Sequence, residues 1–522
     1  MPISTDFLSG LYNRHSCYAD RLSTEQLDAI HVSTAMEESL RKWIKAKKDL
    51  VITGNPGDGK TFLLRRLAKE IEKVQGVQIL DATAEKDYES IIRRWAQARK
   101  AGRPFFLAIN HGPLNRLLQE HSEGNAMLQE VRRQLDQSVY YGEVVPKTPT
   151  GVVVVDLNLR SVLTPEIIAG ALDNILREAH YQDSPYFADV TTDGSRNRQA
   201  LLNEHVRARL IELLCAAGYT TRHISMRDLQ GFLSYLVFGG ATTAELETRR
   251  LEDYEIRYFN LCYSGEGELF KAISDIFDPV RTTMPAIDED LWENTGVYDG
   301  WVFSRPPLTP DHFPDAWKLF RTVKRQYFFE HLDGGRLLDY TNEDERAFQR
   351  LLTNEGELDA QHLGTILQAI NRFYCHGMTE DTNGLRLWGA QEYDTHSPPV
   401  LVSCYRVEKQ KFSLRLPQLA PWLRNAIDFK ANHVLLQYGG TSGKVGLKID
   451  RGLWTALMLA RRGIPMALRS PQYSQLLQSF MTRLHKFEAN SQELQGALIY
   501  NVARNRISEI TVDRAKGRYV SQ

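Results

Sequence analysis

The stretch Gly54–Thr61 constrains the fold of this chain more than any other part of its sequence. It reads Gly-Asn-Pro-Gly-Asp-Gly-Lys-Thr and matches the pattern G-x-x-x-x-G-K-[ST]. The apolar run Leu50–Thr53 before it predicts a short buried strand, and the amphipathic stretch Phe62–Val74 after it predicts a helix. In that context the glycines let consecutive backbone N–H groups face inward as a nest for an anion, and the helix N-terminus adds a favourable dipole. The sequence therefore predicts a phosphate-binding loop (P-loop).

Each residue type in this loop has an expected task. Lys60 would place a point charge against the β- and γ-phosphates of a nucleoside triphosphate, and Thr61 would ligate Mg²⁺. We therefore expect ATP and Mg²⁺ as cofactors. The expected nucleotide-binding residues are Gly54, Asn55, Pro56, Gly57, Asp58, Gly59, Lys60, Thr61 and Phe62.

Three further short apolar runs, Val77–Leu80, Phe105–Ile109 and Val152–Val155, predict more strands. The helical patterns Asp87–Lys100 and Pro113–Ser138 lie between them. Strands that alternate with helices predict an α/β fold with a doubly wound parallel sheet.

A bound Mg²⁺ also needs a carboxylate at the end of a neighbouring strand, and hydrolysis needs a group that orients the attacking water. Asp156 follows the Val152 run directly and is the preferred candidate, both as a metal ligand and as a catalytic residue. Asn110 and His111 follow the Phe105 run, which comes earlier in the chain, and they form the alternative, with His111 as the water-orienting group. Asp81, after the Val77 run, is a third acid, although an Asp in this place is often a helix cap.

The stretch Ile224–Phe238 has a helical period, with Ser225 as its N-cap and Gly239 as its stop. Arg227, near the start, resembles the sensor-2 cation of an AAA+ lid helix and is an expected catalytic residue. An Arg paired with Asp228 or with solvent is the plainer interpretation. Arg160 is a weaker candidate for a finger that reaches a neighbouring subunit of an oligomer.

The length of 522 residues predicts two to four domains. We expect an N-terminal helical extension (1–48), the P-loop core (49–220), a helical lid and junction (221–315) and a C-terminal α+β domain (316–522). The turn signals Arg305-Pro306-Pro307 and Thr309-Pro310 suggest the last boundary.

The five cysteines are widely spaced without any CxxC pair, which argues against a zinc site or a disulfide framework. The chain lacks a signal-peptide pattern and an apolar run of about eighteen residues. A cytoplasmic location without membrane contact is therefore expected.

The formal net charge is −1, so any binding to nucleic acid must come from a local patch. From Arg451 onward, eleven basic residues stand against four acidic ones, a net charge of +7, with tyrosines and a phenylalanine between them. Such a region suits duplex DNA, an acidic protein partner, or simply a solvated helical face. The basic residues are Arg451, Arg461, Arg462, Arg469, Arg483, Lys486, Arg504, Arg506, Arg514, Lys516 and Arg518.

Four blocks together resemble the DptF-like ATPases of bacterial DNA phosphorothioation-dependent restriction systems. They are Gly54–Thr61, Phe105–Leu118, Gly151–Leu163 and Ile224–Gly240, with weaker similarity at Tyr258–Val280 and Leu385–Val402. The resemblance implies an ATPase of a multi-protein restriction or anti-phage defence complex. It also implies that Asn110 is the family's Asn, which an acid follows in relatives, whereas His111 follows it here.

Three functions are consistent with these observations. The first is an ATP-hydrolysing subunit of a DNA-directed defence complex. The second is a nucleotide-gated switch or scaffold with little hydrolysis, which His111 in place of an acid favours. The third is a P-loop kinase, against which the separate lid helix and the long C-terminal domain argue.

Overall fold

The structure is a computed structural model, and the chain divides into two compact units. The first unit is Met1–Tyr140, Val145–Thr341 and Leu419–Lys430, and the second is Tyr141–Val144, Asn342–Gln418 and Ala431–Gln522. Within them, the described residues are 3–13, 22–82, 88–142, 144–220, 222–248, 255–293, 311, 313–340, 343–353, 360–378, 383–390, 400–440, 443–464, 466, 470–488, 496–513 and 518–521.

A four-stranded parallel sheet forms the centre of one half of the first unit. Its order is β2-β3-β1-β5, so that β1 lies between β3, which ends at Asn110, and β5, which ends at Asp156. This confirms the predicted α/β class and its parallel sheet. The strands are β1 (Asp49–Gly54), β2 (Val77–Ile79), β3 (Phe105–Asn110) and β5 (Val152–Asp156).

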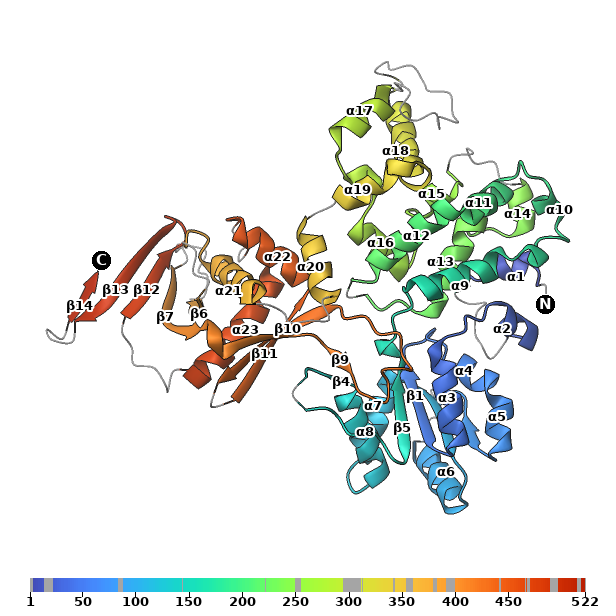
Figure 1. Cartoon of the computed structure of the whole chain (residues 1–522), viewed down its shortest axis with the longest axis horizontal. Helices are drawn as coiled ribbons and strands as arrows, with labels where there is room; N and C mark the ends of the chain where they lie inside the picture. The colour runs from blue at the N-terminus through green and yellow to red at the C-terminus, as the bar shows by residue number, and fades with distance from the viewer. Residues whose placement is uncertain are drawn as a thin grey trace. The chain divides into compact units, whose positions relative to one another are not determined.

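Helices cover both faces of this sheet. Alternate residues of β1 face opposite sides of the sheet and therefore pack against different helices. Leu50 and Ile52 pack with α3 (Ala35–Lys45), α4 (Lys60–Arg66) and α5 (Ala68–Lys73). Val51 packs on the other side, with α6 (Tyr88–Lys100), α7 (His111–His121) and α8 (Ala126–Gln137). Figure 1 shows α3 and α4 on one side of β1 and β5, and α7 and α8 on the other. The sheet is therefore buried on both faces, as an all-parallel sheet requires.

The stretch Pro113–Ser138, predicted as one helix, is in fact two. Gly124 adopts a positive φ of 72°, and the side chain of Asn125 then accepts hydrogen bonds from the backbone N–H groups of Met127 and Leu128. The Gly-Asn pair stops α7 and caps α8, which apolar periodicity alone did not reveal.

A buried glutamine protects the free edge of the sheet at β5. The Gln134 side chain donates to the carbonyl of Val152 at 2.8 Å and accepts from the backbone N–H of Val154 at 2.9 Å. The glutamine side chain thus forms the hydrogen bonds that the backbone of a further strand would form at this edge. The contact fixes α8 against the strand that ends in Asp156.

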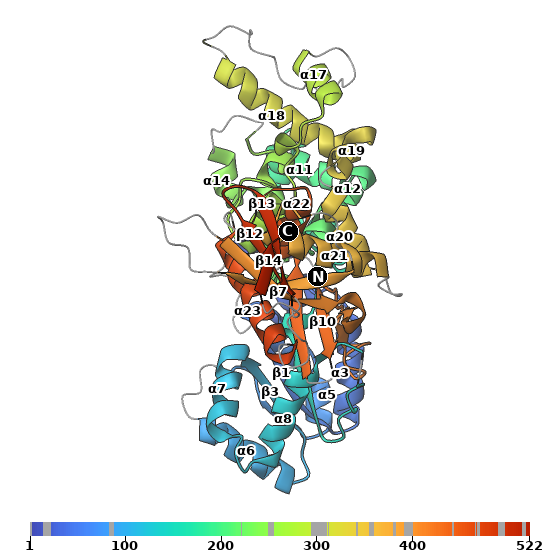
Figure 2. The same ribbon diagram turned by 90° about the vertical axis from the view of Figure 1, so that its left-hand side faces the viewer.

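The rest of the first unit is helical around one large apolar core. The predicted helix α13 (Met226–Phe238) lies within this core, with Ser225 as its N-cap and Gly239 in the left-handed conformation at its end. In Figure 2, α17 and α18 lie at the end of this unit opposite α6. The other α-helices of the unit are α1 (Thr5–Gly10), α2 (Thr24–Ala29), α9 (Pro165–Leu176), α10 (Pro185–Ala188), α11 (Asp193–Leu202), α12 (Glu204–Ala217), α14 (Thr243–Thr248), α15 (Tyr258–Leu261), α16 (Glu268–Ile276), α17 (Pro285–Glu293), α18 (Phe313–Glu330) and α19 (Gly335–Tyr340).

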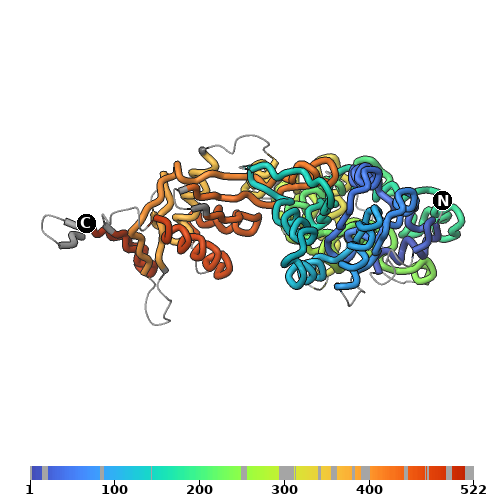
Figure 3. The backbone as a smooth tube through the Cα atoms, turned by 90° about the horizontal axis from the view of Figure 1, so that it is seen from below, coloured from blue at the N-terminus to red at the C-terminus, as the bar shows by residue number. Residues whose placement is uncertain are grey.

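The second unit combines helices with antiparallel sheets of order β14-β13-β12-β7-β6 and β11-β10-β8. The strands β12–β14 form one end of this unit (Figure 3). Its elements are α20 (Glu343–Thr353), α21 (Ala360–Tyr374), α22 (Arg451–Arg461), α23 (Pro471–Glu488), β6 (Gly384–Ala390), β7 (Val400–Glu408), β8 (Phe412–Arg415), β10 (His433–Gly440), β11 (Gly443–Asp450), β12 (Gly496–Asn501), β13 (Arg506–Asp513) and β14 (Arg518–Ser521).

The division between the units differs from the expected boundary at 315/316. Helices α18 and α19 belong to the first unit, because Phe320, Val323 and Phe328 lie in its helical core. Residues 419–430 also belong to the first unit, although the chain on both sides of them belongs to the second. A linear reading of the sequence cannot detect such a return.

No helix within the described ranges is both long enough and apolar enough to cross a membrane. The described cysteines, Cys215, Cys262, Cys375 and Cys404, are free thiols. Cys17, Asp87, the stretch 305–310 and the basic residues Arg469, Arg514 and Lys516 lie outside the described residues.

Replacing Gln134 by Leu tests how the edge of the sheet is held. The variant leaves a carbonyl and an N–H of β5 buried without partners, so we expect a loss of about 2–4 kcal/mol in the free energy of unfolding. Gln129→Leu, at an exposed position of the same helix, is the control and should change little. Urea unfolding measures both, and equal effects of the two variants would contradict this account.

Candidate functional site

The geometry of the sheet places one loop at the centre of its carboxyl edge. We call residues 54–59 the glycine loop; it connects β1 to α4. Gly54 pairs with Asn110 of β3, and Thr53 pairs with Asp156 of β5, so the ends of both neighbouring strands flank the loop. The connection that leaves β1 runs toward β2, whereas the one that leaves β3 runs to β5 on the opposite side. Such a switch point at the carboxyl ends of parallel strands is where α/β sheets bind ligands.

Lys60 is held over the glycine loop. Its ammonium Nζ donates to the carbonyls of Asn55 at 2.6 Å and Gly54 at 3.2 Å, and the residue is only 8% exposed. Burial lowers the pKa of Lys60, while the charges of Asp58, Asp81 and Asp156 oppose this shift. The result is a mostly buried cation fixed beside the first turn of α4.

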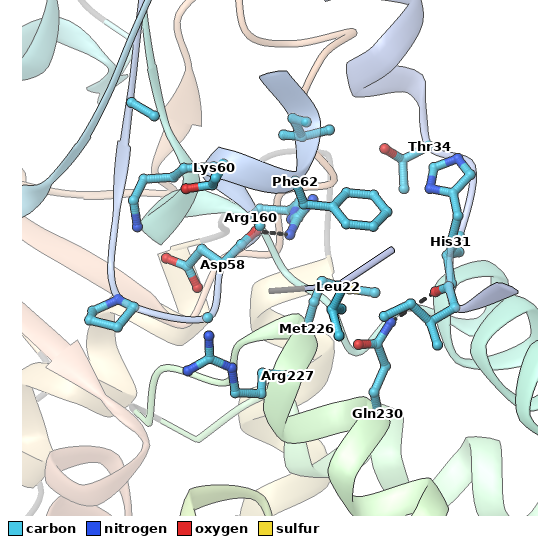
Figure 4. A pocket seen from close by; sticks show the side chains of 18 of the residues that line it. Leu22, His31, Thr34, Asp58, Lys60, Phe62, Arg160, Met226, Arg227 and Gln230 are labelled. Atoms are coloured by element: carbon cyan, nitrogen blue, oxygen red, sulfur yellow. Dashed lines mark hydrogen bonds between the residues drawn. The ribbon is translucent and has the colours of Figure 1, made fainter. Parts of the chain in front are cut away.

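The pocket around Lys60 has a polar end and an apolar end, as Figure 4 shows. Asp58, Lys60 and Arg227 gather at one end. Phe62 lies at the other end and stacks on His31, with ring centroids 5.6 Å apart. Other residues that line the pocket are Leu22, Ile30, Val32, Pro56, Gly57, Gly59, Thr61, Asp81, Asn110 and Met226.

The structure divides the candidate acids between two pockets. Asp81 follows β2 and lines the Lys60 pocket, close to Thr61, whose hydroxyl donates to the carbonyl of Leu80 at 3.0 Å. Asp156, the preferred candidate, instead lines a neighbouring pocket. The charge of Asp81 also raises the pKa of Lys60 more than the charge of Asp156 does. Asp81, the third candidate acid, is therefore the one that shares a pocket with the glycine loop.

Asp156 lies beside His111 in the second pocket. The carboxylate accepts a hydrogen bond from the N–H of Asn158 at 3.0 Å, and its second oxygen lies 3.9 Å from His111 Nδ1. Burial raises the pKa of Asp156, and the charge of His111 opposes that shift. Asn115, Gln119, Arg132 and Asp136 complete the lining. Asn110, although adjacent to His111, lines the Lys60 pocket.

The N-terminus of α13 rests directly on the glycine loop. Ser225 and Asp228 form a reciprocal capping box that starts the helix, and Arg227 in the first turn lines the Lys60 pocket. A Cβ built on Gly57 would lie 2.8 Å from Ser225 Oγ and 3.3 Å from Arg227 Cβ. Gly57 also adopts a φ of +99°, so only glycine fits here. This close approach brings the expected Arg227 to the loop.

Asp58 makes contacts that the sequence did not predict. Its carboxylate accepts from the backbone N–H of Asn55 at 2.6 Å and pairs with His223 Nε2 at 2.7 Å. Its carbonyl accepts from the guanidinium of Arg160 at 2.6 Å. His223 precedes α13 and is 165 residues away in sequence, so no local spacing reveals the pair.

Arg160 does not lie where a finger for a neighbouring subunit would lie. It is 7% exposed, and its guanidinium points to the glycine loop of its own chain. The sequence pattern alone left the direction of this side chain open.

No protein-family model matches this chain, and no curated protein or solved structure matches it. The case for function therefore rests on the site itself. Within the described ranges, no group of three or more His, Cys, Asp or Glu side chains is placed to hold a metal ion without help from a ligand.

Two glycines of the loop make a matched pair for mutation. Gly57 and Gly59 have similar φ values of +99° and +92°, but a Cβ on Gly59 meets nothing within 4 Å. Gly59→Ala should cost only backbone strain of about 1–2 kcal/mol. Gly57→Ala adds the overlap with Ser225, so we expect at least twice the loss in thermal unfolding measurements. Equal losses would show that α13 does not press on the loop.

The Asp58–His223 pair predicts a pH dependence of stability. Burial alone would lower the pKa of His223, but the hydrogen bond and charge of Asp58 outweigh it and raise the pKa. The folded chain therefore holds this proton more tightly than the unfolded chain. The stabilisation is complete below about pH 6.5, the unfolded value, and is lost as the pH rises through the folded value.

His223→Gln tests this sign in urea unfolding at about pH 5.5 and about pH 8.5. We expect the difference in stability between the native chain and the variant to be larger at the lower pH. A difference that is constant, or larger at the higher pH, would contradict a protonated His223 in the folded state.

Proposed function

We propose that this chain is a P-loop ATPase with an AAA+-like lid, which binds and hydrolyses ATP. The observation that carries the proposal is the Lys60 pocket, in which a buried ammonium and a glycine loop meet at the carboxyl edge of a parallel sheet. A triphosphate needs a cation, backbone donors and a helix N-terminus, and this place combines them.

The chain offers a partner for each part of Mg²⁺-ATP. Backbone N–H groups of the glycine loop and the Lys60 ammonium would hold the β- and γ-phosphates. The apolar end, with Phe62 and Met226, suits the flat face of a nucleobase. Thr61 and Asp81 would hold Mg²⁺, and the charge of Asp156 also raises the pKa of Lys60, although less than the charges of Asp58 and Asp81 do. When bound, Mg²⁺ would neutralise charge that develops on the phosphates.

Hydrolysis requires a group that orients water, and two candidates remain. Asn110 lines the Lys60 pocket with its polar side chain. Asp156 at the end of β5 lies 3.9 Å from Nδ1 of His111, which follows β3, and a carboxylate near an imidazole can accept a proton. Arg227 would offset negative charge and link the nucleotide to the angle of α13.

A nucleotide-gated switch is the second candidate, and the location of Asp156 favours it. This carboxylate accepts a hydrogen bond from Asn158 and lines the pocket beside His111 rather than the Lys60 pocket. A chain that holds ATP without an acid aimed at the γ-phosphate would turn over slowly, and partner subunits would then complete the site.

The resemblance to DptF-like ATPases suggests the biological setting. We propose a cytoplasmic subunit of a bacterial restriction or anti-phage defence complex, with other subunits or copies of this chain as partners. Among the described basic residues, Arg504 lies between β12 and β13, and Arg506 begins β13. They support contact with duplex DNA through phosphate charges.

ATP turnover with and without duplex DNA tests the proposal. Lys60→Ala removes the phosphate clamp, and we expect its turnover to fall about 100-fold or more. Lys69→Ala, an exposed lysine of α5, is the matched control and should retain turnover.

Acceleration of the wild-type rate by DNA would support a DNA-directed ATPase. Tight binding of ATP without phosphate release, alone or with DNA, would favour the switch. Failure of ATP to bind would reject both, and equal rates for both lysine variants would assign the activity to a contaminant.

A further inference from the structure

The connection between β8 and β10 is unusually long for two paired strands. These strands are antiparallel neighbours, with Leu436 opposite Leu414, yet residues 416–432 join them. Hairpin connections usually have about 2–5 residues, and ordered connections above about 12 are most often functional. Residues 419–430 of this connection belong to the first unit, although the strands that they join belong to the second. We call them the returning segment.

The returning segment is built into the core beside the glycine loop. Its apolar residues pack with α3, α4 and alternate residues of β1, β3 and β5. Backbone hydrogen bonds fix it as well: Ala420 N–H donates to the carbonyl of Ser138 at 2.9 Å, and Ser39 Oγ donates to that of Asn425 at 3.2 Å. The buried apolar residues are Leu419, Ala420, Trp422, Leu423, Ala426 and Ile427.

The far end of the segment is also anchored in the first unit. Lys430 Nζ donates to the carbonyl of Cys215 at 2.9 Å and lies 3.4 Å from the centre of the Tyr219 ring. Burial lowers the pKa of Lys430 to about 8. The segment is therefore anchored in the first unit from its first residue to its last.

Arg160 and its neighbour Ser161 connect this segment to the glycine loop. The Arg160 guanidinium donates to the carbonyl of Asp58, and the N–H of Ser161 donates to the carbonyl of Asp428 at 2.6 Å. Burial lowers the pKa of Arg160, while the charges of Asp58 and Asp428 oppose the shift. Burial likewise raises the pKa of Asp428, against the charge of Arg160. The buried guanidinium of Arg160 is therefore stabilised by one negative charge from the loop and by one from the segment.

We propose that Arg160 is a positioning residue that couples occupation of the glycine loop to the docking of the returning segment. The proposal rests on nucleotide binding at that loop. β8 ends at Arg415 and β10 begins at His433, so only a few residues separate these strands from the two ends of the segment. A change in the docking of the segment would therefore reach a sheet of the second unit through the chain. The coupling is reciprocal: if nucleotide stabilises the docked segment, weakening the dock lowers nucleotide affinity by the same factor.

Hydrogen exchange on the full chain tests this coupling, with Mg²⁺ and the non-hydrolysable analogue AMP-PNP as the probe. In the wild type we expect slower exchange in peptides of residues 54–61 and also in peptides of residues 419–430. Asp428→Asn keeps the shape of the side chain but removes a negative charge that raises the pKa of Arg160 against the effect of its burial. We expect it to abolish the second effect and to weaken AMP-PNP binding about 5-fold or more, the lower range of measured couplings.

Arg424→Gln is the matched control, because Arg424 lies in the same segment but its exposed guanidinium donates to Tyr140 Oη. It should retain both effects. Arg160→Gln is the more drastic variant, and the wild-type measurement decides the question even where that variant fails to fold.

Protection of residues 54–61 without any change in 419–430 would overturn the coupling and leave the proposed function intact. Absence of protection at residues 54–61 would reject the proposed function itself. Equal loss of affinity in Asp428→Asn and Arg424→Gln would also overturn the assignment to Arg160.

Discussion

The arrangement of the candidate site depends on the three hydrogen bonds of Asp58. Its carboxylate holds the loop closed through Asn55 N–H and reaches His223 at the entrance to α13, and its carbonyl accepts from the buried Arg160. Asp58 is 2% exposed, so each bond forms in a poorly solvated place where an unpaired polar group would be costly. One residue therefore sets the shape of the loop and joins it to a helix on one side and to the end of β5 on the other.

This junction explains why the pocket has residues from such distant parts of the chain. The Lys60 side chain is placed by the turn from β1 into α4, Arg227 by the contact of Ser225 with Gly57, and Asp81 by the strand next to β3. Asp156 ends a strand on the other side of β1 and lies with His111 in its own pocket. The structure thus separates the glycine loop from the Asp156–His111 pair. Under the proposed function, this separation is what favours a switch over fast hydrolysis.

Local sequence signals predicted the elements that hold the loop, because glycine spacing, a buried strand and helix caps act over a few residues. They gave the parallel sheet, the loop, and α13 with Ser225 and Gly239 at its ends. They failed where tertiary contacts decide: Arg160, a candidate finger for a neighbouring subunit, is buried and bound to its own glycine loop, and Asp81 rather than Asp156 shares the Lys60 pocket. The Asp58–His223 pair and the returning segment join residues far apart in the chain, which no short pattern encodes.

The central claim is that the glycine loop binds a triphosphate, and calorimetric titration tests it most directly. The wild-type chain should be titrated with ATP and with AMP, both in the presence of Mg²⁺. In the proposed complex Lys60 and donors of the loop hold the β- and γ-phosphates, which AMP lacks, and hydrogen bonds to charged groups contribute about 1.5–3 kcal/mol each. We therefore predict that ATP binds at least about 100-fold more tightly than AMP. Equal affinities for the two nucleotides, or no binding of ATP, would contradict the account.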